Sequence, residues 1–165
     1  TLLAALSRLP LDYRRVIEEL YGAMNRHDGE AMARMYAPDG RFRDPAFGEL
    51  TGAEAGDMWR MLTSRADDLR VELPEHSVEG DTGTARWIAR YTFTRTGRPV
   101  VNEVRARFRF RENGLIEDHQ DSFSFYRWAR QALGPVGLAF GWAPPMRMMV
   151  RRRARDDLAK FRREA

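Results

Sequence analysis

The chain has 165 residues, which fits one domain, and 43% of them are hydrophobic, enough to bury a core. Its formal charge is +4, but no nucleic-acid-reading motif accompanies the arginine excess, so we expect no nucleic-acid partner. The absence of cysteine excludes disulfides and thiol chemistry, and no apolar run approaches the ~20 residues of a membrane span. Because no secretory signal is visible either, we expect a cytoplasmic protein.

Helical spacing of apolar residues dominates the first half of the chain. A first helix is predicted after an N-cap at Asp12, and a second after Asp28, ending at the turn signal of residues 37–40. Thr51 and Glu54 have the spacing of a capping box and begin a third helix. The inward-facing side chains expected on these helices are Tyr13, Val16, Ile17, Leu20, Met24, Met32, Met35, Tyr36, Met58, Trp59 and Leu62.

The second half alternates between apolar and polar residues, as strands with one covered face do. Residues 84–96 and 100–111 alternate most regularly and are joined by a turn at 96–99, while residues 115–128 and 69–79 form further strands. The covered face is expected to hold Trp87, Ala89, Tyr91, Phe93, Val100, Asn102, Val104, Ala106, Phe108 and Phe110. Three helices followed by an antiparallel meander predict an α+β fold in a single domain of residues 1–165.

A tail from about residue 128 to residue 165 follows this core of about residues 11–127. Residues 134–145 are apolar and rich in Gly and Pro, and residues 145–161 can form an amphipathic helix. The helix would carry its apolar stripe on Met146, Val150, Ala154, Leu158 and Phe161. The tail could cover the core, pack on a partner subunit or touch a membrane surface; we expect it to pack on its own domain.

Polar residues share the covered face of the strands. His119 and Asp121 alternate onto the same face as Phe123 and Phe125, and Asn102 lies among apolar neighbours on another strand. Residues two apart on a strand lie about 6.6 Å apart, so a direct bond between His119 and Asp121 does not follow from spacing alone. Such groups either satisfy one another in a closed core or form the polar floor of a ligand pocket.

No metal site is expected from the histidines. His27 and His76 have the context of surface residues, and the three histidines lack the close spacing of metal ligands. The chain carries no cofactor motif, so cofactor-free chemistry is the simplest expectation.

One carboxylate stands in an unusual place. Asp44 lies between apolar side chains and directly before Pro45 in the stretch Arg41–Gly52. It could form an Asp-Pro turn, or it could face a cavity with its pKa raised by apolar neighbours and transfer a proton.

The order of elements and three stretches resemble the nuclear transport factor 2-like superfamily, in particular its polyketide cyclase (SnoaL-like) and ketosteroid isomerase-like members. The matching stretches are residues 27–45, 50–59 and 108–123, and the likeness covers roughly residues 11–127. The resemblance implies a cone in which a curved antiparallel sheet wraps around helices, with a pocket at one end. Many members are dimers, so a homodimer is expected.

In the isomerase branch, the aspartate before the proline is the general base, and Asp44 matches it. The branch also uses an oxyanion hole made of a tyrosine and a protonated aspartic acid. Counting along the chain places Leu20 at the tyrosine position, leaving Tyr21 one residue out of phase, and Ala106 at the acid position. Both donors are therefore expected to be missing, so we do not expect this protein to isomerise steroids at full speed.

The favoured function is a pocket for an apolar, carbonyl-bearing small molecule, with acid–base chemistry of the isomerase or cyclase type. Asp44 would be the base, His119 the acid or oxyanion donor, and Asp121 the group that supports the charge of His119. The ligand would be lined by Tyr36, Trp59, Trp87, Tyr91, Asn102 and Phe123. The alternatives are a non-catalytic ligand-binding or protein-interaction domain and, third, an epoxide hydrolase-like enzyme, whose relay needs an arginine that the inward face of residues 100–111 lacks.

Overall fold

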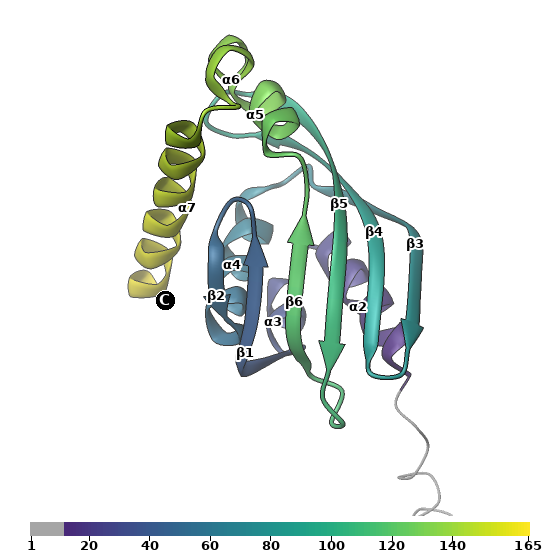
Figure 1. The fold of residues 1–165 in the computed structure, drawn as a ribbon. Coiled ribbons are helices and arrows are strands. Elements are labelled where there is room, and N and C mark those ends of the chain that lie inside the picture. The colour runs from purple at the N-terminus through teal and green to yellow at the C-terminus, as the bar shows by residue number, and fades with distance from the viewer. Residues whose placement is uncertain (1–11) are drawn as a thin grey trace, which may run out of the picture.

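The computed structural model describes residues 12–165, which form an α+β fold around one curved six-stranded sheet (Figure 1). The helices are α2 (Tyr13–Asn25), α3 (Gly29–Ala33), α4 (Gly52–Arg65), α5 (Phe125–Leu133), α6 (Pro135–Phe140) and α7 (Pro144–Glu164). The strands are β1 (Tyr36–Asp44), β2 (Gly48–Thr51), β3 (Arg70–Glu79), β4 (Thr82–Phe93), β5 (Arg98–Phe110) and β6 (Ile116–Ser122). Their order across the sheet is β2-β1-β6-β5-β4-β3.

The helix starts read from the sequence are confirmed. Asp12 accepts a hydrogen bond from the backbone of Arg14, and Asp28 accepts one from Ala31, so each satisfies an amide that the first turn of a helix leaves free. Thr51 and Glu54 form the expected reciprocal capping box at the start of α4. Local side-chain chemistry therefore sets where these helices begin.

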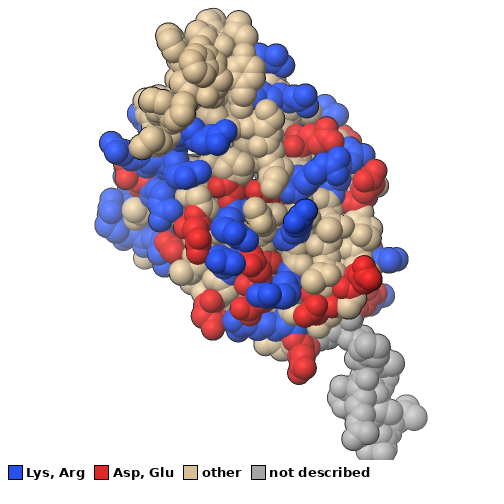
Figure 2. Space-filling model, in the orientation of Figure 1, with Lys and Arg blue, Asp and Glu red and all other residues tan. Residues whose placement is uncertain are grey.

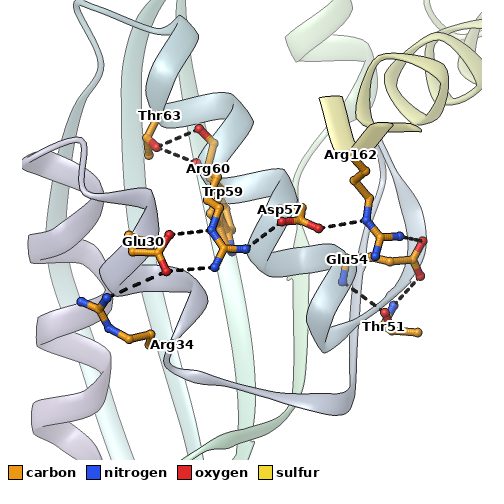
Figure 3. A network of polar contacts seen from close by, with 9 residues as sticks. All are labelled: Glu30, Arg34, Thr51, Glu54, Asp57, Trp59, Arg60, Thr63 and Arg162. Carbon is orange, nitrogen blue, oxygen red and sulfur yellow. Dashed lines mark hydrogen bonds and ion pairs between the residues drawn. The ribbon is translucent and has the colours of Figure 1, made fainter. Parts of the chain in front are cut away.

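Ion pairs tie α4 to its neighbours, as Figure 3 shows. Arg60 of α4 donates two hydrogen bonds to Glu30 of α3, at 2.8 and 3.0 Å. Asp57, also on α4, accepts from Arg60 at 2.7 Å and from Arg162 of α7 at 2.9 Å. These paired guanidinium contacts hold α3, α4 and α7 in one arrangement around the helix that carries Trp59.

The sheet has one covered and one open face, as the alternation predicted. On β5, Val104 and Phe108 are buried, whereas Arg105 and Arg107 between them are exposed. Helices α2, α3 and α4 lie behind the sheet in Figure 1, and acidic and basic residues mix over the front in Figure 2. The core therefore lies between the sheet and these three helices.

The first half of the chain is not purely helical, which corrects the expectation from sequence. Residues 36–51 form the β1–β2 hairpin, so Tyr36 begins a strand and residues 37–40 lie within β1. The register of β1 shifts between Tyr36 and Arg41. Pro38 and Gly40 favour turns over strands, and this irregularity leaves too short an alternation to indicate a strand. β1 also pairs with β6 in parallel, so the sheet is not a simple antiparallel meander.

The last strand and the tail also differ in detail from the expectation. β6 ends at Ser122, and Phe125 begins helix α5 after an N-cap at Ser124. The amphipathic helix of the tail is confirmed as α7, and the side chains of its stripe pack on the domain, with Leu158 3% exposed. Within residues 12–165, no helix is both long and apolar enough to cross a membrane.

Substituting Gly52 tests the contact between α4 and β1. A Cβ at Gly52 would lie 1.8 Å from the carbonyl oxygen of Ala37, which belongs to the backbone and cannot move aside freely. We expect Gly52→Ala to lower the free energy of unfolding by about 2–4 kcal/mol in urea titrations.

The matched control is Gly22→Ala in α2, where the new Cβ would meet only the end of the Arg26 side chain, at 3.3 Å. It should leave the free energy of unfolding unchanged or raise it by up to about 1 kcal/mol, because Ala is the better helix former. Equal effects of the two substitutions would contradict the close contact.

Candidate functional site

Parallel pairing of β1 with β6 brings two carboxylates together. Phe42 lies beside His119 and Arg43 beside Gln120, so the next pair along the two strands is Asp44 and Asp121. Side chains two apart on a strand share a face, and adjacent strands lie about 4.8 Å apart. Asp44 and Asp121 therefore follow the buried pair Phe42 and His119 on the same face, although 77 positions separate them in the chain.

A chain of hydrogen bonds leads to Asp121. The indole N–H of Trp59 donates to the hydroxyl of Tyr36 at 2.9 Å. This hydroxyl then donates to Nδ1 of His119 at 2.8 Å, and Nε2–H of His119 donates to Oδ1 of Asp121 at 2.8 Å. Because an ionised carboxylate can only accept, Nε2 of His119 carries a proton, and Nδ1 of the neutral imidazole then accepts from the Tyr36 hydroxyl. All three hydrogen bonds point towards the Asp121 carboxylate.

The side chains that form this hydrogen-bond chain are buried. His119 is 0% exposed, and Tyr36, Trp59 and Asp121 are 4–5% exposed. The rings of Phe42 and Phe108 lie against the imidazole of His119, with centroids 5.0 and 4.3 Å away. Burial, and then the Asp121 charge, raise the pKa of Tyr36 well above its usual value, so its hydroxyl stays protonated. The direct contact of His119 with Asp121, which spacing left open, is thus formed.

Asp44 lies at the more exposed end of this group of side chains, beyond Asp121. Its carboxylate accepts a hydrogen bond from the backbone N–H of Phe47 at 2.5 Å, so it does form the Asp-Pro turn. Burial raises the pKa of Asp44 to about 7, and the charge of Asp121 adds to the rise, while the hydrogen bonds from the Phe47 and Ala46 amides oppose it. Asp44 is nevertheless only half-buried, unlike Asp121.

Tyr21 joins the same interior, although counting from the isomerase branch left it one residue out of phase. It is 3% exposed, and its ring centroid lies 5.3 Å from that of Trp87. Burial, and then the Asp121 charge, raise the pKa of Tyr21 well above the usual value, although the nearby Trp87 indole opposes the rise. Neither the Tyr21 hydroxyl nor the Trp87 indole nitrogen has a hydrogen-bond partner among the described residues. Two buried polar groups without partners are costly and call for a ligand or water.

The other residues expected to line a pocket lie nearer to α5. The Tyr91 hydroxyl accepts a hydrogen bond from the indole of Trp128 on α5, at 2.8 Å, and Phe123 packs against the cluster around Trp128. Asn102 is half-buried opposite Ala89, and lies four residues, about 13 Å along β5, from the Ala106 that faces Asp121. The structure therefore joins Tyr36 and Trp59 to Asp121 through His119 and places Trp87 beside Tyr21, but it does not bring Asn102 to this group.

Two hollows in the surface lie away from these side chains. One of about 470 Å³ lies over β3, β4 and β5 and includes His76 and Arg86, and one of about 280 Å³ lies between α7 and Leu50 and Glu54. An interior ligand pocket at Asp44 stays a prediction. Among residues 12–165, no group of three or more His, Cys, Asp or Glu side chains is arranged to hold a metal ion.

Tyr36→Phe tests the hydrogen-bond chain. Removing the hydroxyl leaves the Trp59 N–H and the His119 Nδ1 without partners in a buried site, so we expect the free energy of unfolding to fall by about 2–4 kcal/mol. Tyr126→Phe is the matched control, because the Tyr126 hydroxyl donates to Leu138 at an exposed position, and it should cost less than about 1 kcal/mol. Urea unfolding followed by tryptophan fluorescence measures both, and similar costs would count against the chain.

Asp44→Asn tests the raised pKa. Between about pH 4 and pH 7 the unfolded wild type loses the Asp44 proton while the folded protein keeps it, so wild-type stability falls over this range. The Asn amide oxygen can still accept from Phe47 but carries no charge. We therefore expect Asp44→Asn to match wild type near pH 4 and to exceed it by about 1–4 kcal/mol at pH 8.

Asp156→Asn, at an exposed position of α7, is the control and should show no such pH-dependent difference. A stability difference for Asp44→Asn that stays constant from pH 4 to pH 8 would show that the pKa of Asp44 is not raised.

Comparisons with known proteins agree with this architecture. A crystal structure of a protein with a ketosteroid isomerase-like fold from Catenulispora acidiphila is 22% identical, with a TM-score of 0.63, covering 78% of this chain and 97% of that one. The putative polyketide cyclase IdmH from Streptomyces antibioticus is 21% identical, with a TM-score of 0.60, covering 72% and 96%.

The epoxide hydrolase/cyclase-like enzyme SalBIII, of pyran ring formation in the polyether salinomycin, is 14% identical, with a TM-score of 0.61, covering 68% and 90%. Identities this low establish the fold and not the activity. No curated protein matches the chain. The model of the SnoaL-like domain matches residues 17–119, more than half of the chain, and the protein therefore belongs to the SnoaL-like family.

Proposed function

We propose that this protein binds an apolar, carbonyl-bearing small molecule where β1 and β6 end, and moves a proton on it without a cofactor. The observation that carries the proposal is Asp44: a half-buried carboxyl group with a pKa of about 7, lying beside Asp121 at the end of a buried hydrogen-bond chain. A general base works best when its pKa lies near the working pH, because it can then both accept and return a proton.

Asp44 is the base in this proposal. Its carboxylate takes a proton from the carbon next to the carbonyl group, and the electron pair of that C–H bond moves to the carbonyl oxygen, giving an enolate. Protonated Asp44 then returns the proton to another carbon, which is an isomerisation. Alternatively, the enolate carbon attacks a second carbonyl carbon of the ligand, and the alkoxide so formed takes the proton from Asp44, which is a cyclisation.

Tyr21 and Trp87 supply the hydrogen bonds to the enolate oxygen in this proposal. Both are buried donors without partners among the described residues, and the raised pKa of Tyr21 keeps its proton in place at neutral pH. Donors fixed in advance at the position where negative charge develops stabilise the transition state. They take the place of the two donors that counting from the isomerase branch placed at Leu20 and Ala106.

His119 is a positioning residue in this proposal, not the acid. Both of its ring nitrogens are already hydrogen-bonded, and none of its surface is exposed, so it has no atom left to touch a ligand. Its role is to fix the position of the Asp121 carboxylate by the hydrogen bond from Nε2. Burial, and then the negative charge of Asp121, raise the pKa of Asp44, which makes Asp44 a stronger base than an ordinary aspartate.

Two alternatives have weaker support. The hydrogen bond from Phe47 to Asp44 would also suit a non-catalytic binding domain, in which Asp44 only forms a turn. An epoxide hydrolase relay needs an arginine between two acids, and the β5 arginines Arg105, Arg107 and Arg109 are all exposed on the open face.

Binding of a phenolate, which mimics an enolate, tests the proposal. The probe is an aromatic phenol acidic enough to be ionised from pH 5 to pH 9, titrated calorimetrically into wild type and Asp44→Asn. At pH 9 the Asp44 charge repels the phenolate, so we expect Asp44→Asn to bind about tenfold tighter or more. At pH 5, where Asp44 is protonated, the two proteins should bind alike.

Tyr21→Phe should weaken phenolate binding at both pH values, because a donor is lost; Tyr126→Phe, which removes only an exposed hydrogen bond on α5, should not. Equal affinities of wild type and Asp44→Asn at pH 9 would place Asp44 outside the site and favour its role as a turn former. No binding to either protein would favour an interaction domain.

A further inference from the structure

Helix α6 turns its small residues inward and its large apolar residues outward. A Cβ at Gly137 would lie 1.9 Å from the carbonyl oxygen of Ala129, and one at Gly141 would lie 2.9 Å from the Ala129 Cβ, so these glycines form the packed side against α5. Six large apolar side chains of α6, of the loop that follows it and of the start of α7 instead expose 54–71% of their surface. This tail patch consists of Val136, Leu138, Phe140, Trp142, Met148 and Met149.

The tail patch is held in place by backbone and side-chain contacts. The hydroxyl of Tyr126 on α5 donates to the carbonyl of Leu138, and the close contact of Gly137 with Ala129 joins the two helices. The Trp142 indole N–H donates to the carbonyl oxygen of Ala139 at 2.8 Å, although the residue is 71% exposed. Its one polar atom is therefore satisfied internally, and its apolar ring faces outward.

The charge around the tail patch has one sign. Every charged residue from Phe123 to Arg155 is an arginine, and none of these arginines forms an ion pair with another described residue. Arg147 lies over the ring of Phe125, and Arg151 and Arg155 donate only to backbone carbonyls. The surface thus offers apolar groups together with uncompensated positive charge.

The arginines follow the apolar residues along α7 by one helical turn. Met148 and Arg152, and likewise Met149 and Arg153, are four residues apart and lie on one face of the helix, all of them exposed. One turn rises about 5.4 Å, similar to the 5–10 Å to which apolar faces enter a lipid interface. If the methionines lie among acyl chains, the guanidinium groups reach the level of the phosphates.

The shape of this end favours a lipid surface over a second copy of the chain. The end formed by α5 and α6 extends beyond the sheet in Figure 1, and uncharged residues protrude there in Figure 2. A protruding apolar end suits a deformable lipid interface better than a preformed protein groove. A symmetric contact between two copies would also place their unpaired arginines against one another, which costs free energy.

We propose that the tail patch and the arginines beside it bind the surface of a membrane that contains anionic lipids. Trp142 and Phe140 enter the interface, and Arg152 and Arg153 pair with lipid phosphates.

Vesicle flotation with the full chain tests this proposal. Vesicles of phosphatidylcholine alone are compared with vesicles that also contain phosphatidylserine, at low and high salt. Wild type should float with the anionic vesicles, bind at least tenfold less to the neutral ones, and lose affinity as salt is raised. The double variant Phe140→Ser/Trp142→Ser should lose most binding, and Arg152→Gln/Arg153→Gln should lose about tenfold on anionic vesicles.

Arg105→Gln/Arg107→Gln is the matched control, because it removes the same charge from exposed positions on the open face of the sheet. It should bind anionic vesicles as wild type does. Equal losses in the two arginine variants would overturn the proposal in favour of unspecific attraction. The proposal would also be overturned if wild type did not float with anionic vesicles. If, in that case, Phe140→Ser/Trp142→Ser lowered the mass of the protein in light scattering, the tail patch would be a subunit interface instead.

Discussion

The parallel pairing of β1 with β6 is the constraint on which the candidate site depends. All other strand pairs in this sheet are antiparallel, and this one alone brings the end of β1 beside the end of β6. It packs Phe42 edge-to-face against His119 and sets Asp44 next to Asp121. A register shift by one residue would turn Asp44 to the open face, where burial and the Asp121 charge would no longer act on it. The raised pKa of Asp44 is therefore a property of the strand register.

The buried hydrogen bonds show how an apolar interior can hold an ion. Desolvating a lone carboxylate is costly, but Asp121 accepts from an imidazole whose other nitrogen accepts from Tyr36, which in turn accepts from Trp59. Each donor in such a series polarises the next, and the effect accumulates at the carboxylate. The interior thus supplies the hydrogen bonds that water would otherwise give, and the Asp121 charge adds to the effect of burial on the pKa values of Asp44 and Tyr21.

Local chemistry explains which parts of the fold could be predicted from sequence. Caps at Asp12, Asp28 and Thr51, and the alternation along β4 and β5, depend on near neighbours in the chain, and these predictions are confirmed. Strand β1 was not predicted, because its register is irregular and it contains turn-forming residues.

The site was predictable only in part, for a related reason. Alternation placed His119 and Asp121 on the covered face, but their direct bond depends on side-chain rotamers and strand twist. The inward position of Tyr21 depends on how α2 rotates against the sheet, and counting from a motif 23 residues away does not determine that rotation.

Helix α7 connects the tail patch to the turn that contains Asp44. Arg151 donates to the carbonyl of Pro45, and Arg155 donates to those of Phe47 and Glu49, so α7 holds the turn that orients Asp44. The first turns of the same helix carry Met148 and Met149 of the tail patch. If binding of a surface to the tail patch shifts α7, it also changes the affinity of the Asp44 site for its ligand. By thermodynamic linkage, a ligand that binds at Asp44 then changes the affinity of the tail patch for the surface by the same factor.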